Sequence, residues 1–102
     1  MIAVRDGRAE DVGHLTDLWD QAWAGVPRFA MPPMEAAERV LVAEQIGSGT
    51  PVGMAWLRAT PAYPMGPVDS LQVDYLVVHA AHHGRGVGRA LVSAACADAL
   101  LQ

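Results

Sequence analysis

A glycine-rich segment between a strand-like run and a helix-like run constrains this chain more than any other feature. The apolar, β-branched run ends near His79, and the segment GRGVG at residues 84–88 leads directly into a helix-forming stretch. Glycines at alternate positions leave out side chains that would block the close approach of a ligand. The amides of a first helical turn point outward, with the positive end of the helix dipole behind them. The segment therefore predicts a site for an anion such as a phosphate group.

Length and composition predict one globular domain over residues 1–102. The chain is 52% hydrophobic, which favours a packed core over disorder, and its net charge of −4 argues against a general nucleic-acid surface. No stretch reaches the ~20 apolar residues of a membrane span. The short apolar start is soon followed by Arg5 and Asp6, so it does not read as a signal peptide. We expect a cytoplasmic protein that binds neither nucleic acid nor membrane.

Cysteine and histidine usage argues against a metal site. Cys96 is the only cysteine, and its alanine-rich surroundings predict a buried helical thiol. His79, His82 and His83 lie close together in the sequence, but carboxylate and thiolate partners are missing beside them. We therefore expect no metal. His83 could instead donate a hydrogen bond to a phosphate, as a cation when it is protonated.

Hydrophobic periodicity predicts the order of the elements. Apolar residues recur at three- and four-residue intervals from Val12 to Trp23 and indicate an amphipathic helix that Gly25 and Pro27 end. Proline-rich and glycine-rich segments at residues 27–38, 47–51 and 60–67 predict loops, with one helical turn at 34–37. The other predicted elements are strands at 2–5, 40–43, 52–57 and 68–79 and a helix at 86–101. The predicted fold class is α/β, with an α+β mixed sheet in the order β-α-(α)-β-β-β-α.

The residues around the glycines exclude two other phosphate-binding motifs. A Walker loop needs Gly-Lys followed by Ser or Thr, but Arg89 and Ala90 follow Gly88. A Rossmann fingerprint fails because Arg89 or Leu91 stands where its last glycine belongs. One alternative stays open, in which the glycines only make a tight turn between strand and helix.

By spacing, residues 83–88 (HGRGVG) resemble the Q/R-x-x-G-x-G/A signature of the GNAT superfamily of acetyl-CoA-dependent N-acetyltransferases. His83 stands where Gln or Arg is usual. The predicted order of elements resembles the first half of the GNAT fold over nearly the whole chain. Members usually continue with a strand, a helix and two more strands, so the resemblance implies a partial domain that lacks a C-terminal β-α-β-β part. It also implies acetyl-CoA as co-substrate and a small-molecule or peptide amine as acceptor.

The resemblance also implies roles for individual residues. The amide of Val78 is the expected oxyanion donor. Asp74, which strand alternation places on the face of Leu76 and Val78, relays a proton or binds the amine; otherwise it is a solvated or salt-bridged residue. The general acid, usually a tyrosine, is assigned to neither Tyr63 nor Tyr75. The implied cofactor-binding residues are Leu76, Val77, Val78, His83, Gly84, Arg85, Gly86, Val87, Gly88 and Arg89.

Three hypotheses about function follow. The leading one is an N-acetyltransferase that needs a missing C-terminal half. The second is a non-catalytic acyl-CoA-binding or regulatory module. The third is an interaction domain in which the strand at 68–79, open on one side, pairs with its own copy in a homodimer or with a complementary C-terminal fragment. Loops 25–37 and 60–67 would border the acceptor site by family position.

Overall fold

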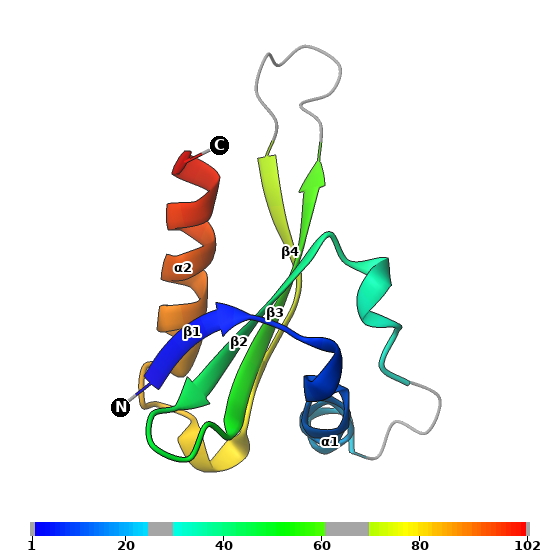
Figure 1. Ribbon diagram of the computed structural model, residues 1–102, viewed down its shortest axis with the longest axis vertical. Coiled ribbons are helices and arrows are strands. Elements are labelled where there is room, and N and C mark those ends of the chain that lie inside the picture. Colours follow the sequence, from blue (N-terminus) through cyan, green and yellow to red (C-terminus); the bar gives the residue numbers. More distant parts are fainter. Residues whose placement is uncertain (1, 25–29, 61–69, 102) are drawn as a thin grey trace.

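The computed structural model describes residues 2–24, 30–60 and 70–101. Gly25, Pro27 and most of the predicted loop at 60–67 lie outside these ranges. The elements follow the predicted order (Figure 1): β1 Ile2–Asp6, η1 Ala9–Asp11, α1 Val12–Ala22, η2 Met34–Ala36, β2 Arg39–Gln45, β3 Pro51–Thr60, β4 Ser70–Val78, η3 Ala80–His82 and α2 Val87–Leu101. The predicted fold class and element order are confirmed.

The four strands form one sheet in the order β1-β2-β3-β4. Neighbouring strands pair antiparallel in all three described pairings. Helix α1 lies on one side of this sheet and α2 on the other (Figure 1). A mixed sheet would also contain a parallel pair of strands. None of the three pairings among the described strands is parallel.

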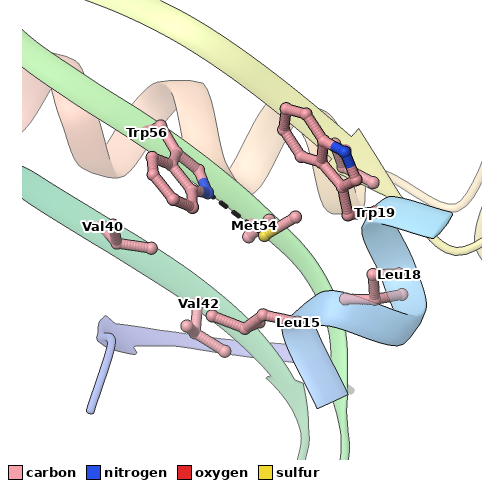
Figure 2. Packing of buried hydrophobic residues seen from close by; sticks show 8 residues of the cluster. Leu15, Leu18, Trp19, Val40, Val42, Met54 and Trp56 are labelled. Atoms are coloured by element: carbon pink, nitrogen blue, oxygen red, sulfur yellow. Dashed lines mark hydrogen bonds between the residues drawn. The ribbon is translucent and has the colours of Figure 1, made fainter. Parts of the chain in front are cut away.

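Each face of the sheet has its own hydrophobic cluster, because successive side chains of a strand point to opposite faces. Figure 2 shows part of the cluster on the α1 side, where Trp56 Nε1 donates a hydrogen bond to Met54 Sδ at 3.3 Å. Its fully or nearly buried members are Leu15, Leu18, Trp19, Val40, Val42, Met54, Trp56 and Val77. The cluster on the α2 side consists of Leu41, Ala43, Val52, Ala55, Leu57, Val87, Leu91 and Ala95.

An ion-pair network joins β1, η1 and β2. The Arg5 guanidinium donates to both carboxylate oxygens of Asp11, at 2.8 and 2.9 Å, and to Glu44 Oε2 at 2.7 Å. The amide of Arg8 also donates to Asp11 Oδ2 at 2.7 Å. Although Asp11 is buried, the hydrogen bonds from Arg5 hold the pKa of its carboxyl below the usual range. Contact with Asp11 and Glu44 raises the pKa of Arg5 in turn.

The prediction that Cys96 is buried is wrong. The residues of α2 that pack on the sheet are Val87, Leu91 and Ala95, which recur every four positions. Cys96 comes one residue later, about 100° further around the helix, and is exposed. Val12 of the predicted apolar stripe, the first residue of α1, is also 42% exposed. No helix in the described ranges combines the length and apolar character that crossing a bilayer requires.

Candidate functional site

The glycines of the loop before α2 have two different structural roles. Gly84 and Gly86 have φ angles of +78° and +82°, a region that strains residues with a side chain. Gly88 is not among the glycines with positive φ, and an added Cβ would lie 3.8 Å from Val78 Cγ2 and 3.9 Å from Leu76 Cδ2. A tight turn therefore explains the first two glycines but does not require the third.

The first turn of α2 presents main-chain donors. Ala90 is the first residue whose amide joins the helical pattern, donating to the Gly86 carbonyl at 2.9 Å. The amides of Val87, Gly88 and Arg89 precede it and have no main-chain acceptor within the described part of the chain. The amide of Arg85, also expected to face a phosphate, donates instead to the His82 carbonyl at 3.3 Å.

A cavity of about 470 Å³ opens at this loop. Its lining includes Val78, His83 and Arg89 together with loop glycines, and no carboxylate among the described residues contributes to it. Arg85 lines a separate cavity of about 260 Å³ with Ile2 and Gln45. Of Arg85 and Arg89, the two arginines that the resemblance implies as cofactor-binding, only Arg89 lines the loop cavity.

His83 connects the loop to the end of β4. Its Nε2 atom lies 2.8 Å from the Val78 carbonyl oxygen. Since a carbonyl can only accept, Nε2 carries the hydrogen, and a neutral ring then offers Nδ1 as an acceptor. His79 Nδ1 accepts from the amide of Ala81 at 3.1 Å. Within the described ranges no group of three or more His, Cys, Asp or Glu side chains could hold a metal ion.

Strand β4 is the outer strand of the described sheet. The N–H and C=O groups of its successive residues point alternately toward β3 and toward the open edge. The amide of His79 donates to the Val52 carbonyl on β3 at 2.8 Å. Antiparallel alternation then directs the main chain of Val77 toward β3 and that of Leu76 and Val78 toward the open edge. Of the three strand residues that the resemblance implies as cofactor-binding, Leu76 and Val78 face this edge. The side chain of Val77 is buried on the α1 side.

A β-bulge overturns the predicted orientation of Asp74. Trp56 pairs with Tyr75 but Leu57 pairs with Val73, so Asp74 is an extra residue in β4. Its side chain lines a cavity with Trp56 and Tyr75, whose rings belong to the α1 side. Leu76 and Val78 lie instead beside Gly88 of α2. The prediction that Asp74 shares their face is wrong, because the bulge interrupts the alternation.

Asp74 has a partner that the sequence did not reveal. Arg58 Nη2 donates to Asp74 Oδ1 at 3.1 Å, so the salt-bridged alternative for this carboxylate is the observed one. Arg58 belongs to no motif. Only the pairing of β3 with β4 brings it close to Asp74.

A family model described as an acetyltransferase (GNAT) domain matches residues 36–102, which is more than half of the chain. The chain belongs to the GNAT acetyltransferase family. Its match extends from η2 through α2 and so includes the loop, β4 and the Arg58–Asp74 pair. A search of curated protein sequences finds no match.

Solved structures agree with this GNAT assignment in fold. A transcriptional regulator from Bacillus halodurans C-125 is 18% identical, with a TM-score of 0.80, and the match covers 97% of this chain and 74% of the regulator. A ribosomal-protein-alanine N-acetyltransferase from Brucella melitensis biovar Abortus 2308 is 21% identical, with a TM-score of 0.77 and coverage of 97% and 72%. An acetyltransferase from Trypanosoma brucei is 20% identical, with a TM-score of 0.74 and coverage of 96% and 74%.

In this GNAT chain, β4 connects the two candidate regions. The loop cavity adjoins Val78 at one end of the strand, and the Arg58–Asp74 pair lies at the middle of the strand. Asp74 and Val78 are four positions apart, which corresponds to about 13 Å of extended chain. An elongated molecule held at the loop can therefore follow the open edge of β4 toward Asp74.

Proposed function

We propose that the chain is an acetyl-CoA-dependent N-acetyltransferase that transfers an acetyl group to a primary amine. The observation that carries this proposal is the set of main-chain donors at the start of α2. There Val87, Gly88 and Arg89, whose amides have no main-chain acceptor among the described residues, line the loop cavity. Backbone donors at a helix N-terminus suit a pyrophosphate. Family membership supplies the reason to choose acetyl-CoA among pyrophosphate-containing molecules.

The open edge of β4 is the proposed track for the pantetheine arm. The main chain of Leu76 and Val78 faces this edge, where amide groups of the arm can pair with it as a neighbouring strand would. The Val78 carbonyl accepts from His83, so the Val78 amide is the group left for a ligand. This amide is the proposed oxyanion donor, since an amide can stabilise the negative charge that develops on the thioester oxygen.

The transfer itself needs little covalent chemistry from the protein. The nitrogen of a neutral amine attacks the thioester carbonyl carbon, a C–N bond forms, and the C–S bond breaks to release the CoA thiolate. Asp74 binds the incoming amine and accepts, through water, the proton that the nitrogen loses, because about 13 Å of extended strand separates Asp74 from Val78. Solvent protonates the thiolate. Arg58 keeps Asp74 in place through the hydrogen bond at 3.1 Å.

Gly88 offers the cleanest test of CoA binding, because its backbone conformation does not require glycine. An Ala methyl group would meet Leu76 and Val78 at ordinary contact distances, so Gly88→Ala should fold and keep its affinity for CoA. Gly88→Val places branched carbons beside Leu76 and Val78, next to the loop cavity that Gly88 lines, and should weaken binding by ~100-fold, comparable to losing about two charge-assisted hydrogen bonds. Calorimetry with CoA compares the two variants. Equal CoA affinity in wild type and Gly88→Val contradicts the proposed site.

A further inference from the structure

A small cavity lies between the segment around η2 and the sheet. Its volume is about 270 Å³, below the roughly 300–1,000 Å³ of pockets for drug-sized ligands. Pro32, Ala36 and Ala37 line one wall, and Trp56 and Tyr75 line the side of the sheet. The two aromatic rings meet edge to face, with centroids 5.9 Å apart. The cavity therefore has room for a small molecule and an apolar wall for its side chain.

Two opposite charges in contact with each other complete this cavity. Arg58 Nη2 lies 3.1 Å from Asp74 Oδ1, and their side chains are 54% and 19% exposed. A guanidinium has five N–H donors, so Arg58 can bind a second anion while it remains beside Asp74. A carboxylate has two oxygens and can accept from an ammonium in the same way. The pair can therefore bind one cationic and one anionic group side by side.

We propose that this cavity selects an acceptor with an amine next to a carboxylate, as in a free α-amino acid. The inference rests on the acetyl transfer proposed above. One carbon joins the two charged groups of an α-amino acid, so these groups lie as close together as Arg58 and Asp74 do. The ammonium binds Asp74, the carboxylate binds Arg58, and the amino-acid side chain contacts Tyr75 and the wall around η2. The ammonium releases one proton to solvent before the neutral amine attacks.

The same arrangement disfavours acceptors that carry only positive charge. A polyamine that placed one ammonium on Asp74 would bring further cations near Arg58, and like charges across an interface are costly. The cavity also lies near the edge of β4 that is proposed for pantetheine. Asp74 lies two residues, about 7 Å of extended strand, from Leu76, whose main chain faces the edge proposed for pantetheine.

The test compares three probes by calorimetry on the 102-residue chain: L-leucine, L-leucinamide and putrescine. Leucinamide keeps the amine of leucine but lacks its negative charge, and putrescine carries two amines. Wild type should bind leucine ~10-fold more tightly than either, the value of one charge-assisted hydrogen-bonded pair. Arg58→Gln should bind leucine and leucinamide alike, and Asp74→Asn should bind neither. Arg39→Gln is the matched control, because Arg39 pairs with Asp6 outside this cavity and its loss should leave the preference unchanged.

The outcomes distinguish a wrong acceptor class from a wrong assignment of the acetyl transfer. Equal affinity of wild type for leucine and leucinamide, or an unchanged preference in Arg58→Gln, overturns the inference, and so does a putrescine affinity that matches that of leucine. Arg58 is half-exposed, so its variant should fold, and circular dichroism checks this. CoA binding without a preference for leucine refutes only the acceptor class. A leucine preference without CoA binding refutes only the acetyl transfer.

Discussion

The two candidate regions differ in what builds them. The loop before α2 is local: residues 84–89 are contiguous, and main-chain amides provide most of its donors. The cavity at Arg58 and Asp74 is assembled from η2, β3 and β4, and it depends on one extra residue in the pairing of two strands. A site made of main chain tolerates changes in neighbouring side chains, whereas a site made of side chains depends on strand register.

The loop and the cavity also rest on different cores. Helix α2 packs on one hydrophobic cluster through Val87 and Leu91. The aromatic residues of the cavity belong to the other cluster, where the Trp19 and Tyr75 rings meet edge to face at 4.8 Å. Damage to one cluster should therefore affect one region more than the other.

Truncating Trp56 should have the largest effect on stability and on leucine binding. Trp56 is 1% exposed, packs in the α1-side cluster and lines the cavity. Trp56→Ala should lower the free energy of unfolding by about 3–5 kcal/mol and abolish leucine binding. In the fraction that stays folded, affinity for CoA should be retained, because the loop rests on the other cluster. Urea unfolding measures the stability, and calorimetry measures the affinities. A decrease of less than about 1 kcal/mol in the free energy of unfolding, or a parallel loss of CoA affinity, contradicts the separation of the two regions.

Replacing Asp11 should have the second-largest effect on stability. Ligand binding in both regions should be unchanged, because Asp11 lines neither the loop cavity nor the Arg58–Asp74 cavity. Asp11→Asn should destabilise the fold by about 1–3 kcal/mol, since it removes one of the two carboxylates that pair with Arg5 while Glu44 remains. The lowered pKa of Asp11 means that wild type loses this stabilisation as the pH falls below 3.8, the ordinary value, through the lower native value. Unfolding measured between neutral and acidic pH should show a smaller acid-dependent loss in the variant. An equal loss in both proteins would assign the acid sensitivity to other groups.

The smallest expected effect is a weak association of two chains through the open edge of β4. Val73 and Leu76 on β4 and Val92 on α2 are 41%, 44% and 41% exposed, and natural proteins rarely leave an apolar strand edge uncovered. We propose that this edge pairs weakly with a second copy of the chain and that pantetheine competes for it. Sedimentation should show a concentration-dependent dimer that CoA shifts toward monomer. A monomer at every concentration, or a dimer that ignores CoA, argues against this pairing.

The sequence predicts the local region better than the assembled one. The glycines, the strand before them and the helix after them are contiguous, so local pattern alone identifies the loop, and the positive φ angles of Gly84 and Gly86 agree with it. The bulge at Asp74 and its contact with Arg58 depend on the register of β3 against β4, which periodicity within one strand does not reveal. The error at Cys96 has a similar cause, because an alanine-rich helix does not show which of its faces meets the sheet.

Chemical-shift mapping on ¹⁵N-labelled protein tests most directly the central claim that β4 joins a phosphate site to a separate acceptor site. CoA should shift the amides of Val87, Gly88 and Arg89 most, with smaller shifts at Leu76 and Val78. Leucine should shift the amides of Asp74 and Tyr75 and leave those of Val87 to Arg89 unchanged. Shifts from CoA that are confined to Asp74 and Tyr75, or no shift at Val87 to Arg89, would contradict the account.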